Sequence, residues 1–272
     1  WTLSRGLGDV YKRQLPISLF KTHTIKTGNF KTNHVFESSA STGSTTSKHH
    51  IHRINDYHEN CLKIIENRIG PLLEYEIFGL LPNYLERKNS SLVSMVEFLM
   101  QKNEQPLNFY LYNFKELDQK MHESSKKKLL FGVSFALMDF AKDYPQSLSD
   151  ITVIETGGMK GRKQEITKSE LYQILQKSFK GSTIISEYGM TELLSQAYSD
   201  ENGIYLCPSW MKVLPRAVND PLSKHRTIGH TVALNIIDLA NVNSCCFIAT
   251  DDLGKIYDCL LYTSDAADEL CR

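Results

Sequence analysis

Apolar side chains recur at helical spacing in several segments of the chain. Three of these predict amphipathic helices: DYHENCLKIIENRI at 56–69, SSLVSMVEFLMQK at 90–102 and FKELDQKMHES at 114–124. A fourth helix is predicted after Thr167, because Thr167 and Glu170 form a capping-box pair at its start and Gly181 suits its end.

Shorter apolar runs between these helices predict strands. They are EYEIFGLLP at 74–82, LNFYLYN at 107–113, KKLLFGVSF at 127–135, ITVIETG at 151–157 and STIISEYG at 182–189. From 203 to 250 the pattern changes to strands and turns with little helix. The order predicts an α/β fold, a layered sheet with flanking helices in a domain at 15–202, followed by a β-rich subdomain at 203–258.

Both ends of the chain resemble translated sequencing-adapter DNA. Residues 4–14 read SRGLGDVYKRQ, and residues 259–269 read CLLYTSDAADE. The adapter GATGTGTATAAGAGACAG translates to DVYKRQ, and its reverse complement, shifted by one base, translates to CLLYTS. We therefore interpret 1–14 and 259–272 as not native and exclude them from the fold. We expect native sequence to be lacking at both ends, and residues 1–10 and 263–272 to lie outside the core.

Composition excludes several classes of protein. The 31 Lys and Arg residues balance 31 Asp and Glu residues, which argues against a general nucleic-acid binder and against broad attraction to anionic membranes. No apolar run approaches the ~20 residues of a membrane span. The six cysteines are unevenly placed and do not form the pattern of a secreted disulfide framework, so we expect a reducing, cytoplasmic location.

The segment SSASTGSTTSK at 38–48 is rich in small hydroxylated residues and ends in Lys48. Backbone N–H groups, hydroxyls and one cation suit a polyphosphate. The segment lacks the GxxxxGK pattern of a Walker loop. A solvated polar linker is the alternative interpretation of this segment taken alone.

Three further segments place polar groups after predicted strands. In SEYGMTE at 186–192, Tyr188 can stack on a base and Glu192 can take Mg²⁺; the alternative is a helix start capped by Thr191. In IATDDLG at 248–254, a carboxylate after an apolar strand can bind a ribose; the alternative is a turn. The paired glycines of ETGGMKGR at 155–162 allow close backbone approach or simply a turn.

In this order, the motifs resemble those of the adenylate-forming (acyl-activating) superfamily: a Ser/Thr/Gly phosphate loop ending in Lys, a YGxTE motif and a TGDLG-like motif. The opening LPISLFKTH at 15–23, the continuation SKHHI, the GGMKGR turn and SEYGMTELLSQAYS resemble the LuxE-type acyl-protein synthetase branch, a relative of phenylacetate–CoA ligases.

The resemblance implies a role for each matching residue. Phosphate-loop roles fall on Ser38, Ser39, Thr42, Gly43 and Lys48, and adenine contacts fall on Gly157, Gly158, Tyr188, Gly189 and Met190. Thr191 would touch the α-phosphate, Glu192 the Mg²⁺ and Asp252 the ribose. The catalytic set would be Lys48, Thr191 and Glu192.

The resemblance also implies an activity. With ATP and Mg²⁺, a carboxylic acid, most simply a fatty acid, would become acyl-AMP, and a thiol on a partner protein would then take the acyl group. Transfer to coenzyme A is one alternative. A non-catalytic nucleotide- or acyl-binding module is another, favoured by Ala40 and Asp251 where the family has Gly. The superfamily's C-terminal domain should follow the DLG motif, but the adapter-like segment begins at 259. We therefore expect this chain alone to form little acyl-adenylate.

Overall fold

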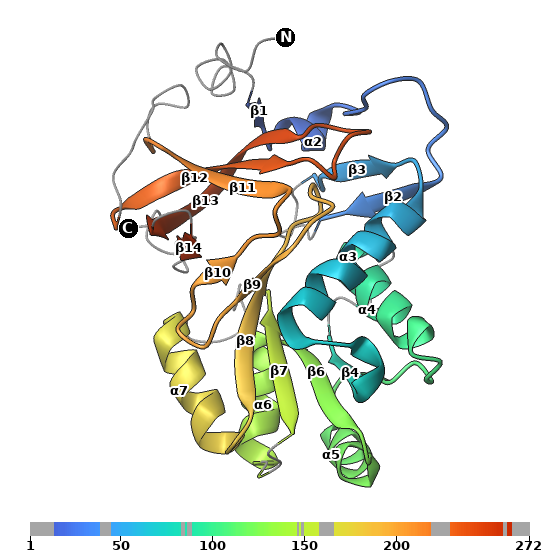
Figure 1. Cartoon of the computed structure of the whole chain (residues 1–272), viewed down its shortest axis with the longest axis vertical. Coiled ribbons are helices and arrows are strands. Elements are labelled where there is room, and N and C mark those ends of the chain that lie inside the picture. Colours follow the sequence, from blue (N-terminus) through green and yellow to red (C-terminus); the bar gives the residue numbers. More distant parts are fainter. Residues whose placement is uncertain are drawn as a thin grey trace. The chain divides into compact units, whose positions relative to one another are not determined.

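The computed structural model describes residues 14–38, 45–82, 85, 89–145, 147, 150–157, 166–218, 229–257 and 260–262. The chain divides into two compact units, each discontinuous in sequence (Figure 1). The first unit comprises Trp1–Asn60, Gly189–Ala197 and Ile204–Arg272, and the second comprises Cys61–Tyr188 and Tyr198–Gly203. The chain returns to the first unit after Gly203. The sequence predicts a domain boundary at 202, and the predicted domain limits stay a prediction.

A parallel sheet forms the centre of the second unit. Its spatial order is β5-β4-β6-β7-β8, and every pairing in it is parallel. The strands are β4 (Tyr75–Leu80), β5 (Phe109–Tyr110), β6 (Lys127–Val133), β7 (Ile151–Thr156) and β8 (Thr183–Tyr188). Because the strands are parallel, their carboxyl ends lie along one edge, the usual place for ligand-binding groups in such sheets.

Helices connect these strands. They are α3 (Ile54–Ile69), which enters this unit at Cys61, α4 (Ser91–Lys102), α5 (Phe114–Glu123), α6 (Ser134–Asp143) and α7 (Lys168–Ser178), with a short 3₁₀ turn η3 (Leu72–Glu74). The predicted capping box of α7 is confirmed, since the Thr167 side chain accepts from the Glu170 amide and the Glu170 side chain accepts from the Thr167 amide. No helix in the described part of the chain has the length and apolar character needed to cross a membrane.

Gly132 in β6 allows helix α6 to pack closely on the sheet. A Cβ atom at this position would lie 2.5 Å from the side chain of Leu137, which is fully buried in α6. The surrounding core is apolar on both faces of the sheet, as in other parallel sheets covered by helices; its members include Ile77, Phe78, Leu129, Phe131, Ile154 and Ile185.

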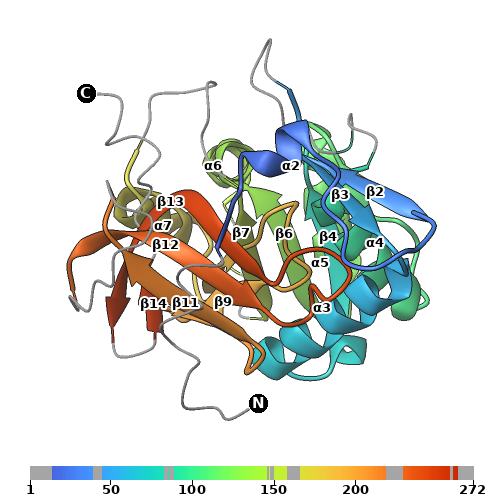
Figure 2. The same cartoon turned by 90° about the horizontal axis from the view of Figure 1, so that it is seen from above.

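The first unit is rich in antiparallel strands. In its sheet β11 (Met211–Arg216) pairs with β12 (Thr231–Asp238), and β12 pairs with β13 (Phe247–Tyr257) (Figure 2). The short β1 (Leu15–Pro16) adds in parallel to β13, and β14 (Leu260–Tyr262) pairs with both β13 and β10 (Tyr205–Leu206). A separate hairpin joins β2 (His34–Glu37) to β3 (Lys48–Ile51), and α2 (Leu19–Thr22) precedes it. Strand β9 (Ala197–Ser199) begins in this unit at Ala197 and continues into the second unit at Tyr198.

Two expectations from the sequence need correction, and one stays open. The strand predicted at 107–113 is reduced to Phe109–Tyr110, because β5 has only β4 as a neighbour and Leu111 and Tyr112 are exposed. The adapter-like segment at 259–272 is not wholly outside the fold, since β14 joins a sheet; exposed strand edges readily accept another extended segment. Residues 1–10 and 263–272 lie outside the described residues.

Candidate functional site

Residues 189–196 form a turn in the first unit, and no helix follows it. The chain passes Gly189 and Met190, and the Leu193 amide donates to the Met190 carbonyl at 3.1 Å. The alternative of a helix beginning at Thr191 is therefore wrong. The EYGMTE motif ends in an irregular turn whose backbone groups need partners from elsewhere in the unit.

Glu192 is the buried carboxyl of this turn, with 4% of its surface exposed. Burial raises the pKa of the Glu192 carboxyl, and the negative charge of Asp252 raises it further. A hydrogen bond from the Ser47 hydroxyl and the positive charge of Lys21 lower it. Glu192 and Asp252 come from separate motifs and interact electrostatically within the first unit. A cation beside them would favour their charged forms.

The ATDDLG motif lies in a β-bulge rather than at a strand end. The register of β12 and β13 passes from Ala233↔Leu253 to Asn235↔Ala249, so Leu234 alone faces three residues of β13. The Thr250 hydroxyl donates to the Leu234 carbonyl at 2.9 Å and accepts from the Asp252 amide at 3.2 Å. The expected strand end and the alternative turn at 248–254 are both wrong, because β13 continues to Tyr257. A bulge of this kind bends the strand and changes the direction in which its side chains point.

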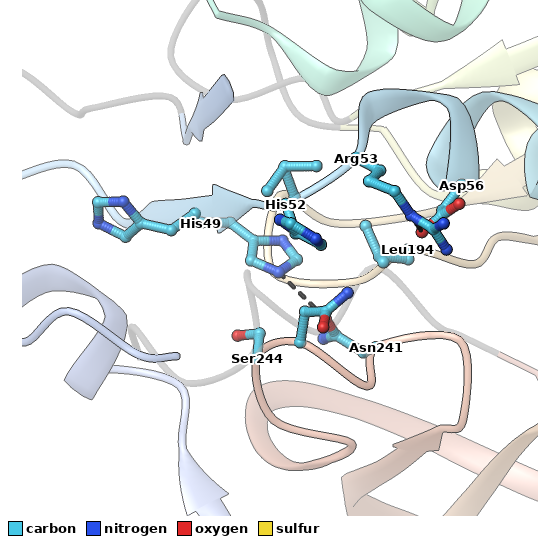
Figure 3. A pocket seen from close by; sticks show the side chains of 10 residues that line it. His49, His52, Arg53, Asp56, Leu194, Asn241 and Ser244 are labelled. Atoms are coloured by element: carbon cyan, nitrogen blue, oxygen red, sulfur yellow. Dashed lines mark hydrogen bonds and ion pairs between the residues drawn. The ribbon is translucent and has the colours of Figure 1, made fainter. Parts of the chain in front are cut away.

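His49 and Asn241 bond the backbone of the motif turn, and their side chains lie next to each other (Figure 3). His49 Nδ1 lies 2.8 Å from the Thr191 carbonyl oxygen, and His49 Nε2 lies 3.1 Å from Asn241 Oδ1. The Asn241 amide nitrogen donates to the Glu192 carbonyl at 2.8 Å. Each of the two side chains is 1% exposed. Burial lowers the pKa of His49 to about 4, against the hydrogen bonds to Thr191 and Asn241.

Asp238, at the end of β12, holds the next residues of the same turn. Its carboxylate accepts from the Leu194 amide at 2.9 Å, from the Ser195 amide at 3.0 Å and from the Ser195 hydroxyl at 2.7 Å. The indole N–H of Trp210 also donates to the Ser195 hydroxyl oxygen, at 3.0 Å. Side chains thus fix both halves of the turn: His49 and Asn241 bond Thr191 and Glu192, and Asp238 bonds Leu194 and Ser195.

The hydroxyl-rich loop is closed at its base. The Ser38 amide donates to the Ser47 carbonyl at 3.1 Å, and the Ser47 amide donates to the Ser38 hydroxyl oxygen at 2.9 Å. Lys48 begins β3 with its side chain 55% exposed, 3.8 Å from Glu37. Because side chains alternate along a strand, Lys48 and the buried His49 lie on opposite faces of the hairpin.

In the second unit, buried hydroxyls connect the carboxyl ends of three parallel strands. The Ser134 hydroxyl, directly after β6, shares its proton between Glu155 Oε1 at 2.5 Å and the Gly157 carbonyl oxygen at 2.7 Å. The Ser186 hydroxyl donates to Glu155 Oε2 at 2.5 Å, and the Tyr172 hydroxyl lies 2.9 Å from Ser186. Gly157 has φ +73°, which favours glycine. The network holds Gly157 at this sheet edge.

Tyr188 and Gly157, two of the expected adenine contacts, both belong to the second unit, and each lies at or just beyond the carboxyl end of its strand. The other expected residues in the described part of the chain, namely Ser38, Lys48, Gly189, Met190, Thr191, Glu192 and Asp252, belong to the first unit. Ser39, Thr42, Gly43 and Gly158 lie outside the described residues.

The described residues contain no group of three or more His, Cys, Asp or Glu side chains that could by itself hold a metal ion. This arrangement differs from a dedicated metal centre. Mg²⁺ in nucleotide sites is commonly held by one or two carboxylates together with substrate phosphates. Glu192 and its neighbour Asp252 supply donors of that kind.

Sequence reasoning missed three residues of this site: His49, Asp238 and Asn241. The KHHI run at 48–51 forms strand β3, in which His49 is buried. The available signal was alternation, since His49 shares a strand face with Ile51. No pattern in the sequence around Asp238 or Asn241 indicates contact with a turn more than 40 residues earlier.

The sequence matches no protein-family model and no curated protein. Solved structures do match. O-succinylbenzoate coenzyme A synthetase from Bacillus subtilis in complex with AMP aligns with a TM-score of 0.64 at 13% identity, over 86% of this chain and 49% of that protein. The same enzyme has also been solved with ATP and magnesium ion.

Two further solved structures show the same similarity. Coronafacic acid ligase from Pectobacterium brasiliense aligns at 15% identity with a TM-score of 0.55, over 86% of this chain and 47% of that protein. The N-terminal subdomain of Klebsiella oxytoca NpsA with 3-hydroxybenzoyl-AMSN aligns at 15% identity with a TM-score of 0.58, over 84% and 62%. The chain spans about half the length of the first two. It therefore has the mixed α/β fold of the N-terminal domain of adenylate-forming enzymes, which confirms the predicted fold class.

Proposed function

We propose that the protein to which this chain belongs activates a carboxylic acid with ATP and then transfers the acyl group to a thiol. The observation that carries the proposal is the buried Glu192 carboxyl beside Asp252 and the Ser47 hydroxyl, within the turn that ends the EYGMTE motif. The fold adds support, since structures with this fold include complexes with AMP and with ATP and magnesium ion.

The chemistry has two steps. An ionised carboxylate oxygen attacks the α-phosphorus of ATP, the bond to the bridging oxygen breaks, and pyrophosphate leaves with acyl-AMP formed. A thiol then attacks the acyl carbon, AMP leaves, and the thiol proton is released. No general base is needed in the first step, because the carboxylate is already ionised. The groups around the phosphate act by positioning and by offsetting charge.

The donors in the first unit fit Mg²⁺. Glu192 carries a desolvated carboxyl, Asp252 adds a second negative charge, and Lys21 offsets these effects only as the smallest of the contributions to the Glu192 pKa. When bound, Mg²⁺ would offset the phosphate charge of ATP. Glu192 would hold this ion, Thr191 would bond the α-phosphate, and Asp252 would bond the ribose.

The remaining assignments belong to the same proposal. Lys48 would act with Thr191 and Glu192 in catalysis, and the other ATP contacts are Ser38, Ser39, Thr42, Gly43, Gly157, Gly158, Tyr188, Gly189 and Met190. We propose a fatty acid as the acid and a protein thiol as the acceptor, as in the LuxE-type branch. The motifs LPISLFKTH and SEYGMTELLSQAYS support this choice over coenzyme A.

The test is calorimetry with ATP and with AMP, each with and without Mg²⁺. We expect ATP to bind, with a dissociation constant of roughly 1 mM, the affinity of a few open contacts. Glu192→Gln should weaken Mg²⁺-dependent ATP binding roughly tenfold and leave AMP binding nearly unchanged, because AMP lacks the phosphates that Mg²⁺ bridges. Glu201→Gln, an exposed carboxylate, is the matched control.

Failure of ATP and AMP to bind at ~10 mM would exclude the proposed function. Equal losses of ATP and AMP binding in Glu192→Gln would remove Glu192 from the metal role. For the acceptor, acyl transfer by the intact gene product is measured with coenzyme A and with a candidate protein thiol. Preference for coenzyme A, or nucleotide binding without pyrophosphate release, would support one of the two alternatives.

A further inference from the structure

The turn at 191–195 is irregular, so its backbone carbonyls have no partners from a helix. Two buried side chains form hydrogen bonds with two of these carbonyls instead. His49 bonds the Thr191 carbonyl, and Asn241 bonds the Glu192 carbonyl. The two side chains also lie against each other, with 3.1 Å between His49 Nε2 and Asn241 Oδ1 (Figure 3). The carbonyl group before Glu192 and the carbonyl group of Glu192 itself are therefore both held by buried side chains.

Asn241 is fixed in one amide orientation. Its nitrogen donates to the Glu192 carbonyl at 2.8 Å and to the Cys245 carbonyl at 3.1 Å, so the oxygen must face His49. The backbone N–H of Asn241 donates to the Asp238 carbonyl at 3.1 Å, and this bond holds the main chain at Asn241 in place. A flipped amide would bring its oxygen against two carbonyl oxygens, which is unfavourable.

The imidazole of His49 is fixed as well. It lies inside the β2–β3 hairpin face, because alternation along β3 turns His49 and Ile51 to the buried side. The ring of Phe20 packs edge-on against it, with centroids 5.8 Å apart and an interplanar angle of 85°. Both members of the pair are thus preorganised by packing before any ligand binds.

We propose that His49 and Asn241 are positioning residues for the nucleotide site, acting through the backbone of Thr191 and Glu192. The inference rests on the proposed function. By holding the carbonyls of Thr191 and Glu192, the pair fixes the backbone of these two residues. The backbone in turn sets the positions of the Thr191 hydroxyl and the Glu192 carboxyl. Neither side chain touches the nucleotide; a displacement of the turn would separate Glu192 from the metal while leaving the rest of the nucleotide contacts in place.

The test compares Mg²⁺-dependent ATP binding with AMP binding in His49→Phe, which keeps a flat ring but removes the ring nitrogen that bonds the Thr191 carbonyl. We expect Mg²⁺-dependent ATP affinity to fall roughly tenfold and AMP affinity by less than about twofold. His49→Gln, whose amide can donate to the Thr191 carbonyl, should recover part of the loss. His50→Phe, on the opposite face of the same strand, should behave as the unchanged chain.

Asn241→Ala provides a second variant should His49→Phe not fold, as judged by circular dichroism, and it should show the same selective loss. Hydrogen exchange adds a readout without nucleotide: amides at 191–195 should exchange faster in both variants than in His50→Phe. Unchanged Mg²⁺ dependence in the folded variants, or equal losses for ATP and AMP, would overturn the inference and leave the proposed function standing. If the unchanged chain binds no nucleotide, the proposed function fails and the inference fails with it.

Discussion

Glu187 is a half-buried carboxyl at the carboxyl end of β8 in the second unit. It accepts a hydrogen bond from the Thr156 hydroxyl at 2.5 Å. Burial raises the pKa of Glu187 to about 7, and the charge of Glu155 raises it further, against Thr156 and Lys168. A pKa raised in the folded state means that folding favours the protonated form. Stability from this group is therefore present below pH 4.5 and is lost as the pH rises through 7.

Glu187→Gln should remove this pH dependence. We expect the variant to be more stable than the unchanged chain at pH 8 by roughly 2 kcal/mol, and to show no gain at pH 4.5, where the carboxyl is protonated in the folded state. Urea unfolding at the two pH values measures the difference. Glu201→Gln is the exposed control. A gain of the same size at both pH values would show that the effect is not titration.

At the scale of elements, strand β6 and helix α6 are coupled through Gly132. Replacing Gly132 with Ala would place a methyl group 2.5 Å from Leu137. We expect Gly132→Ala to lower the unfolding free energy by about 1–3 kcal/mol, the usual cost of overpacking a core. The measurement is chemical denaturation.

A double variant tests the cause. In Leu137→Ala the clash is absent, so the added methyl should fill space and the two substitutions should be less destabilising together than the sum of the single effects. Additive losses would show that Gly132 is needed for its backbone rather than for the approach of α6.

At the scale of the whole molecule, the adapter-like segment at 259–272 contributes one short strand, β14. We expect a chain ending at Asp258 to keep its thermal midpoint within a few degrees, because a strand of only three residues adds few hydrogen bonds of about 1 kcal/mol each, even though it pairs with both β13 and β10. Thermal unfolding monitored by circular dichroism measures this. A large drop would show that β14 is an integral part of the β13 and β10 pairing.

The sequence by itself determined the order of strands and helices in the second unit and the capping of α7. These features depend on local periodicity and on contacts between neighbours in the chain, such as Thr167 and Glu170. It also indicated Glu192 and Asp252, because their motifs keep a recognisable order. The fold class followed from the alternation of elements alone.

Only the tertiary structure decided how the motif turn is held. The contacts of His49 with Thr191 and Asn241 span 142 and 192 residues, and the bulge at Asp252 depends on the register between β12 and β13. Periodicity reports which face of an element is buried, but it carries no information about which distant carbonyl a buried side chain will meet. That is settled by tertiary packing within the first unit, which brings His49, Asn241 and the turn at Thr191 together.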